Sequence, residues 1–374
     1  MRSIMIGGGV AGCAVAAALR GSAAGESRVV IERRAAGAPA GMGFILMPNG
    51  LAALDEIAPE FDWRSAGRCI DRVVLRTADG RVLSEQAIEA AVCVGRERFL
   101  HMLREAAAGA EFIEGAACTG LAEDCSAGAR AVTLADGRVV EGDLFFGCDG
   151  AQSRVRGMVF PQARLGETVV KEIVSVAHAP ALARSLGTAF HKFHDEEGGL
   201  AVGMLAEGDE RVVWFVQFDA RRWTGVAATS ESLRAFAAER TQGWAPEVAV
   251  ALSGTDFQHS HLWATRDLEP LAALARGNIA LVGDAAHACL PFTSQGANGA
   301  LVDAAVLRCV LADVRGRSGV ASAFALYSGL RRPHHRRMFM EGRRLQAAFL
   351  APLAGTTPVV PLAQVEPSAV RVNR

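Results

Sequence analysis

The chain has 374 residues, of which 51% are hydrophobic and 21% charged, and its formal net charge at pH 7 is -1. This hydrophobic content excludes a disordered chain, and a length of about 150 residues per domain predicts two or three domains, or one large domain that carries an inserted one. The near balance of 39 basic and 40 acidic residues gives no support to nucleic acid or an acidic membrane surface as a partner.

Cysteine spacing and the N-terminal stretch bear on metal binding and location. None of the eight cysteines forms a C-x-x-C pair and no His/Cys cluster has zinc spacing, so we expect reduced thiols and no metal site. The uncharged stretch 4–19 imitates a secretory signal, but glycines interrupt it. No other uncharged run reaches the roughly 20 apolar residues of a membrane span. We predict a cytoplasmic protein with no membrane partner.

The first elements form a strand (3–6), a glycine-rich turn (7–12), a helix (10–19) and a second strand (28–31). Asp-Gly pairs at 79–80 and 136–137 then predict two hairpins, with an amphipathic helix over 97–108 between them. Regularly spaced apolar runs predict an antiparallel meander at 187–193, 200–205 and 211–218. A strand over 279–282, helices over 300–314 and 323–350, and a proline-containing tail over 351–374 complete the chain.

The glycine-rich turn is followed at a set distance by an acidic residue. Gly7, Gly9 and Gly12 form G-x-G-x-x-G, and Glu32 follows Gly12 by 20 residues at the end of the next predicted strand. In a dinucleotide site the first glycine makes the turn, the second lets the pyrophosphate approach, and the third lets helix and strand pack closely. A packing turn without a ligand is the alternative, but the context favours a dinucleotide.

The residues around this motif indicate the kind of dinucleotide. Val10 and Ala11 begin the helix, whose N–H groups and dipole favour phosphates. Glu32 would accept hydrogen bonds from the ribose hydroxyls. Arg33 hints at a 2′-phosphate, but the charge of Glu32 opposes one, so NAD or FAD fits better than NADP here.

Three later segments carry a family resemblance. Residues 147–156 (Gly-Cys-Asp-Gly-Ala-Gln-Ser-Arg-Val-Arg) resemble the DG fingerprint of single-component aromatic hydroxylase flavoproteins, and residues 283–304, which begin Gly-Asp-Ala-Ala-His, resemble their GD fingerprint. Residues 41–50 resemble a segment of the salicylate-hydroxylase-like branch, and Arg96 begins a match to the family's R-x-x-L-x-x-x-L helix. The chain thus resembles the class A flavin monooxygenases, the para-hydroxybenzoate hydroxylase family, from residue 3 to about 337.

The resemblance implies an α/β fold: a Rossmann-like, GR2-type three-layer FAD-binding domain, an inserted antiparallel β-sheet substrate domain, and C-terminal helices. The expected division is 1–70, 95–160 and 275–350 for the FAD-binding domain, 71–94 and 161–274 for the substrate domain, and 351–374 for the tail. We expect a monomer or a homodimer.

The resemblance also implies cofactor-binding roles. Asp284 would hold the FAD ribityl hydroxyls, although a helix N-cap is its alternative role. Gly296, Ala297 and Asn298 would face the N1–C2=O edge of the flavin, and Pro291 would fix the loop beside the isoalloxazine as the candidate catalytic position. The remaining expected FAD contacts are Gly7, Gly9, Val10, Ala11, Gly12, Glu32, Arg33, Gly43, Arg96, Asp149 and the backbone of Cys118. Ser294 departs from the family, which usually has glycine there.

In the family, NADH or NADPH reduces the FAD, and O₂ adds to give a C4a-hydroperoxide that oxygenates an aromatic substrate. The substrate would lie between the meander sheet and the flavin. On the 211–218 strand one face carries Trp214 and Phe218 and the other carries Phe215 and Gln217, and the alternation does not show which face meets the pocket. Because the sheet is largely apolar, Trp214 and Phe218 are our candidate contacts for a bulky or polycyclic aromatic. His191 could deprotonate a phenol, or it is a surface histidine.

Other activities on the same scaffold stay open at this point. Epoxidation and oxidative decarboxylation share these motifs. A tryptophan-type halogenase would carry W-x-W-x-I-P, and the five tryptophans form no W-x-W pair. A non-enzymatic flavin redox sensor is the alternative from another class. The identity of the substrate, the position oxygenated and the choice between NADPH and NADH are not readable from the motifs.

Overall fold

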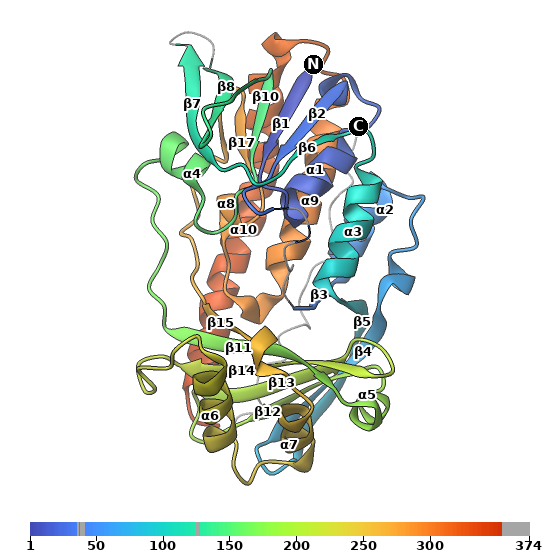
Figure 1. Cartoon of the computed structure of the whole chain (residues 1–374), viewed down its shortest axis with the longest axis vertical. Helices are drawn as coiled ribbons and strands as arrows, with labels where there is room; N and C mark the ends of the chain where they lie inside the picture. Colours follow the sequence, from blue (N-terminus) through green and yellow to red (C-terminus); the bar gives the residue numbers. More distant parts are fainter. Residues whose placement is uncertain (36, 38–41, 125–127, 354–374) are drawn as a thin grey trace.

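The computed structural model describes residues 1–353 except 36, 38–41 and 125–127. Figure 1 shows two parts stacked along the long axis of the molecule, one built on a six-stranded sheet and the other on an eight-stranded sheet. Helices and a small three-stranded sheet surround the six-stranded sheet. The predicted α/β fold with a Rossmann-like part and a separate β-sheet part is therefore confirmed. The predicted C-terminal tail lies, from residue 354 on, outside the described residues.

The six-stranded sheet has the order β16-β17-β10-β1-β2-β6, and all its neighbouring strands are parallel except β16 and β17. Its strands are short, apolar and mostly buried, as expected for a parallel sheet covered on both faces. In Figure 1 the N-terminus, where β1 begins, lies at the end remote from the eight-stranded sheet. The carboxyl ends of the parallel strands therefore point toward the eight-stranded sheet. The strands are β1 (Arg2–Ile6), β2 (Ser27–Ile31), β6 (Glu111–Ile113), β10 (Leu144–Gly147), β16 (Ala275–Arg276) and β17 (Ile279–Leu281).

Helices and the three-stranded sheet bury this sheet in one hydrophobic core. The three strands are β7 (Cys118–Asp124), β8 (Gly128–Leu134) and β9 (Val139–Glu141). The helices are α1 (Val10–Ala18), α2 (Pro48–Ile57), α3 (Arg96–Ala106), α4 (Arg154–Val159), α8 (Asp284–His287), α9 (Gln295–Leu311) and α10 (Val320–Leu350). Short 3₁₀ turns are η1 (Ala23–Gly25), η2 (Arg64–Ala66), η4 (Pro291–Thr293) and η5 (Arg317–Gly319). Helix α9 packs against α1, α2 and α10, and these three helices hold it in place.

The eight-stranded sheet has the order β15-β11-β14-β13-β12-β4-β5-β3. The predicted meander is confirmed as β12, β13 and β14, but β12 and β4 pair in parallel, so the sheet is not wholly antiparallel as expected. These two strands belong to separate passes of the chain, and no tight turn joins them to impose an antiparallel pairing. The strands are β3 (Phe44–Leu46), β4 (Arg68–Thr77), β5 (Val82–Val94), β11 (Val170–His178), β12 (Ala189–His194), β13 (Leu200–Ala206), β14 (Arg211–Asp219) and β15 (His261–Ala264).

The two faces of the eight-stranded sheet have different neighbours. One face packs on α5 (Pro180–Leu186), α6 (Ser230–Arg240), α7 (Pro246–Ser253) and η3 (Phe257–His259), and we call it the helix-covered face. The other face contacts η4 and the end of α10 from the six-stranded part, and we call it the inner face. Side chains alternate between these faces along each strand, so the identity of a strand residue decides whether it can reach a site between the two parts.

Several local expectations are met and a few boundaries move. Both Asp-Gly hairpins form, with Gly80 and Gly137 at positive φ. Helix α9 begins at Gln295 rather than 300, because the left-handed backbone of Ser294 turns the chain directly into it. β3, which the expected division places in the FAD-binding domain, is the edge strand of the eight-stranded sheet. Within the described part of the chain, no helix has both the length and the apolar character needed to cross a bilayer.

Candidate active site between the two sheets

The glycine-rich turn between β1 and α1 has the close contacts that its sequence predicts. A Cβ on Gly7, whose φ is +117°, would lie 2.2 Å from the Cys148 carbonyl oxygen. A Cβ on Gly12 would lie 1.8 Å from the Gly7 oxygen, so helix and turn pack as closely as the backbone allows. A Cβ on Gly9 would meet nothing within 4 Å. Two glycines are thus required by packing, whereas Gly9 faces open space.

The N-terminus of α1 is free to attract an anion. Its N-cap, Gly9, provides no capping side chain, and the first turn from Val10 and Ala11 holds no acidic residue. Glu32 lies beside the turn, where its carboxylate accepts hydrogen bonds from the N–H groups of Gly8 (2.7 Å) and Arg34 (2.8 Å). The helix dipole and the acid therefore lie together at the carboxyl ends of β1 and β2, whereas the side chain of Arg33 is exposed.

The DG segment closes the other side of this turn. Asp149 Oδ2 accepts from the Arg154 and Val155 N–H groups (2.7 and 3.1 Å), while its buried Oδ1 has no hydrogen-bond partner among the described residues. The Cys118 carbonyl accepts from Arg154 Nη1 (3.5 Å), and its thiol is buried. An orphaned carboxylate oxygen next to Gly7 is a polar atom that a ligand can satisfy.

Arg156 joins the DG and GD segments. It is buried and donates to the carbonyls of Asp284 (3.4 Å), Ala285 (3.1 Å) and Ala151 (2.6 Å). The guanidinium therefore fixes α8 against the loop that carries Asp149. Arg156 lies within the DG motif, but no role for it was predicted from the sequence.

Asp284 and Arg96 approach the same space from opposite elements. The Asp284 side chain is solvent-accessible, yet the surrounding protein raises its pKa above the ordinary value, against the opposing charges of His287, Arg96 and Arg156. Burial likewise lowers the pKa of Arg96, which begins α3, and Asp284 partly offsets this. Each charge stabilises the other, since Arg96 lowers the pKa of Asp284 and Asp284 raises the pKa of Arg96. The two side chains are therefore within electrostatic reach of each other across this space.

The first turn of α9 presents unoccupied N–H groups. Its N-cap, Ser294, has a left-handed backbone (φ 52°, ψ 25°) and makes no side-chain cap, as judged over the described residues. Gly296 and Ala297 follow it and are partly exposed. Asn298 is buried and bonds the β3 segment through the Met47 N–H (2.9 Å) and the Ile45 carbonyl (2.9 Å). Asn298 is thus placed to anchor the helix start, while its neighbours present their N–H groups.

Two amides beside this turn were not predicted as site residues. Asn49 Nδ2 donates to Gln295 Oε1 (2.8 Å), and both side chains are buried. Asn49 Oδ1 and Gln295 Nε2 find no partner within the described chain. Both residues lie in segments that matched the family, so the signal was present in the sequence. In the loop before α9, the Pro291 carbonyl accepts a hydrogen bond from the Ser294 N–H (3.0 Å). Gly43 packs closely on Val213, and a Cβ at residue 43 would lie 2.9 Å from Cγ2 of Val213.

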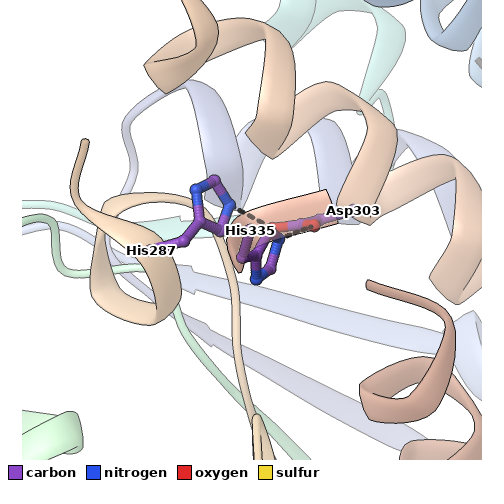
Figure 2. Close-up of side chains that lie close together, drawn as sticks. All are labelled: His287, Asp303 and His335. Atoms are coloured by element: carbon purple, nitrogen blue, oxygen red, sulfur yellow. Dashed lines mark hydrogen bonds and ion pairs between the residues drawn. The ribbon is translucent and has the colours of Figure 1, made fainter. Parts of the chain in front are cut away.

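One cluster of described residues has the composition of a metal site. His287 Nε2 lies 2.8 Å from Asp303 Oδ2 and His335 Nε2 lies 3.3 Å from Asp303 Oδ1, with the two rings 3.9 Å apart (Figure 2). However, Arg331 Nε lies 2.6 Å from the same Oδ1, and the Gly283 N–H donates to Oδ2 (2.9 Å). A guanidinium already neutralises this carboxylate and disfavours a cation. We interpret the cluster as a buried network that fixes the GD turn to α9 and α10.

The structure corrects the expected substrate contacts. Trp214 is fully buried on the helix-covered face, where its Nε1 donates to Thr255 Oγ1 (2.8 Å) and its ring meets Phe257. Phe218 is fully buried on the same face, against Phe236 of α6. Both therefore point away from the six-stranded part. The sequence showed that the strand has two faces, but it did not show which face α6 and α7 would cover.

His191 also lies on the helix-covered face. It pairs in register with Met204, which packs in the core beneath the helices. Burial, with the nearby Arg76, lowers the pKa of His191 to about 4, so the imidazole is neutral at pH 7. Its expected contact with the substrate is therefore wrong, because the alternation of β12 turns its side chain the other way.

The inner face presents a different set of side chains. Phe215 is half-buried, and its ring lies over Gly203, where a Cβ would come within 2.1 Å of it. Lys192 Nζ donates to Gln217 Oε1 (2.6 Å), and its Nζ lies 5.5 Å from the ring centroid of Phe292 in η4. These residues were missed as site residues, although the alternation around His191 and Trp214 places them on the opposite face.

Comparisons with known proteins identify the family. A family model described as an FAD binding domain matches residues 1–341. The 3-amino-4-hydroxybenzoate 2-monooxygenase PtnB3 of Streptomyces platensis is 30% identical over 373 residues, covering 94% of this chain and 89% of that protein. An FAD-dependent urate hydroxylase of Mycolicibacterium vanbaalenii is 26% identical, with 88% and 84% covered.

Solved structures share the fold. Klebsiella pneumoniae HpxO complexed with FAD and uric acid superposes with a TM-score of 0.82 at 23% identity, covering 94% of this chain and 89% of that one. The tetracycline destructase Tet(51) superposes with a TM-score of 0.71 at 22% identity, covering 94% and 91%. Together with the site geometry, the family match and the full-length relatives lead to one conclusion: this chain belongs to the FAD-binding family and is a class A FAD-dependent monooxygenase.

Proposed function

We propose that this enzyme inserts one oxygen atom of O₂ into an aromatic substrate held between the inner face and the first turn of α9. NADPH or NADH is the reductant. The observation that carries the proposal is the uncapped start of α9, because Gly296 and Ala297 present N–H groups beside η4, which meets the inner face. Such donors stabilise negative charge on a bound group without reorganising.

The residues around the glycine turn fit FAD. The open space at Gly9 and the uncapped start of α1 suit the pyrophosphate, and Glu32 suits a ribose. Asp149 Oδ1, Asn49 Oδ1 and Gln295 Nε2 are buried polar atoms that a ligand can satisfy. When bound, FAD supplies the redox chemistry, accepting a hydride from the nicotinamide and activating O₂.

The protein's own residues would orient the cofactor, neutralise its negative charge and keep water from the reacting atoms. Arg96 and Asp284 would hold the cofactor from α3 and α8, and the α9 N–H groups would favour its anionic reduced form. Pro291 and Phe292 would exclude water beside the reacting atoms. Since Trp214 and Phe218 face away, they no longer support a bulky or polycyclic substrate, and the inner face combines aromatic rings with polar groups.

The experiment that tests this function is turnover under ¹⁸O₂ with the FAD-loaded enzyme and a panel of hydroxy- and amino-substituted aromatics. We expect mass spectrometry to find one ¹⁸O atom in the product for each NAD(P)H consumed with the best substrate. A product labelled from H₂¹⁸O instead, or NAD(P)H oxidation that no aromatic couples to oxygen insertion, would contradict the proposal.

A further inference from the structure

Lys192 is a buried ammonium on the inner face of β12. The chain has only two lysines among its 39 basic residues, Lys171 and Lys192. The Lys192 side chain is 4% exposed, and its Nζ donates to Gln217 Oε1 at 2.6 Å. Gln217 Nε2 in turn donates to Glu172 Oε1, so the acid is reached only through an intervening amide. The ammonium is therefore oriented from behind, and no carboxylate among the described residues is bonded to it directly.

Aromatic rings surround the ammonium on its other sides. Its Nζ lies 5.9 Å from the ring centroid of Phe215 on β14, 5.5 Å from Phe292 in η4 and 5.7 Å from Phe349 on α10. Gly203 makes this possible, because the Phe215 ring lies across the position that a side chain at 203 would fill. Aromatic faces stabilise a cation but accept hydrogen bonds poorly. Two of the three Nζ donors thus face rings and are available to a stronger acceptor.

A second buried donor lies on the same face. His194 follows Lys192 by two residues on β12, a separation of about 6.6 Å along a strand. It is 9% exposed, and its Nε2 has no hydrogen-bond partner in the described part of the structure. Burial and the charge of Lys192 lower the pKa of His194 to about 3, so the neutral ring has one nitrogen that can donate. Unsatisfied buried groups of this kind are rare unless a ligand or water uses them.

These groups lie next to the proposed reaction site. Phe292 directly follows Pro291, and both belong to η4, which leads into the first turn of α9. A group bound by Lys192 would therefore hold an aromatic ring between Phe215 and the loop beside the flavin. A group with two anionic oxygens is the natural acceptor for an ammonium with two available N–H donors and a nearby imidazole.

We propose that Lys192 binds the carboxylate of the substrate, so that this enzyme acts on aromatic acids. The inference rests on the proposed function for the location of the site, and it names the substrate class. Glu172 and Gln217 act as positioning residues that orient the ammonium without competing with a ligand for its free donors. Burial lowers the pKa of Lys192 to about 8, and the charge of Glu172 opposes this shift, so the ammonium form prevails at pH 7. Lysine suits this role because its compact ammonium leaves room for the rings.

The test measures binding, independently of turnover. FAD-loaded enzyme is titrated with hydroxy- and aminobenzoates and with the matching benzamides, and dissociation constants are read from the change in flavin absorbance. We expect the wild type to bind the best acid about tenfold or more tightly than its amide, as for a charge-assisted contact. Lys192→Met should bring that ratio close to one, and Lys192→Arg should keep a preference for the acid.

Lys171→Met is the matched control, because Lys171 pairs in register with Phe218 and lies on the helix-covered side of the same sheet. It should keep the wild-type ratio. A purely structural role of Lys192 would change FAD loading or unfolding without changing the ratio of acid to amide, and that result overturns the inference. If Lys192→Met fails to load FAD, the acid and amide dissociation constants of the wild type decide. A wild type that binds acids and amides equally, or that binds neither, overturns the inference.

The outcomes separate this inference from the proposed function. Selective binding of acids that depends on Lys192, in an enzyme that inserts no oxygen, would support the inference and contradict the function. Oxygen insertion into neutral aromatics, with no preference for acids, would support the proposed function and contradict the inference.

Discussion

Ser294 is the one non-glycine residue with a positive φ in the described chain, at 52°. A side chain in this region costs about 1 kcal/mol, and glycine removes the cost. We predict that Ser294→Gly is about 1 kcal/mol more stable than Ser294→Ala in chemical unfolding. The control is Ala325→Gly, on the exposed side and in the interior of α10, where glycine should be about 1 kcal/mol less stable than alanine. If the glycine variant were less stable than the alanine variant at both positions, this result would contradict the left-handed backbone of Ser294.

The buried histidines predict how stability depends on pH. Burial lowers the pKa of His335 well below its ordinary value and that of His334 to about 3, so both fold in the neutral form. The unfolded chain binds these protons near pH 6.5, so stability is complete above that pH and falls as the pH drops below it. Asp303, whose pKa is held well below its ordinary value, adds a further loss below about pH 4.

The measurement is the unfolding free energy between pH 8 and pH 5. We expect a clear decrease in the wild type and a smaller one in His335→Gln, which cannot take up a proton. An unchanged slope in this variant would show that His335 does not contribute to the pH dependence.

Among the elements, the β1–α1 turn contains one glycine that packing requires, Gly12, and one that faces the expected phosphate site, Gly9. Gly9→Ala adds a methyl group that meets nothing, so it should fold with normal stability but lose at least tenfold in FAD affinity, because the methyl group lies where the pyrophosphate would approach. Gly12→Ala places its methyl group against the Gly7 oxygen and should fail to fold stably. FAD fluorescence quenching and circular dichroism measure the two effects. Normal FAD binding by Gly9→Ala would contradict the location of the phosphate site.

The elements that carry local signals were predictable from the sequence. The glycine turn, both Asp-Gly hairpins and the three meander strands follow from spacing, turn chemistry and alternation, and they appear close to their expected positions. The start of α9 was misplaced because Ser294 adopts a backbone that its residue type seldom takes. The parallel pairing of β12 with β4 joins passes far apart in the sequence, and no local pattern encodes it.

At the scale of the whole molecule, the two faces of the eight-stranded sheet have different tasks. Trp214→Leu removes a buried ring and the bond to Thr255, so it should cost about 3 kcal/mol of stability and leave KM nearly unchanged at low temperature. Phe215→Leu on the inner face should cost less stability and raise KM several-fold. Thermal unfolding and steady-state kinetics measure both. A rise in KM confined to Trp214→Leu would show that the faces have been exchanged.

Which face of the eight-stranded sheet meets the site could not be predicted from the sequence. Alternation sorts Trp214 and Phe218 from Phe215 and Gln217, but both sets are compatible with burial. The decision depends on α6 and α7, which follow later in the chain and fold back over one side. Lys192, the one lysine or arginine on a strand otherwise made of apolar residues and histidines, was the available signal for the inner face.

We propose that a nicotinamide reduces FAD bound between the two sheets and that the substrate lies beside it. The most direct measurement is the anaerobic visible spectrum of the FAD-loaded enzyme on adding NADPH, then NADH, with and without aromatic acids. We predict that one nicotinamide bleaches the bound flavin and that an aromatic acid accelerates the bleaching. A bound flavin that neither nicotinamide reduces, under any of these conditions, would contradict the account.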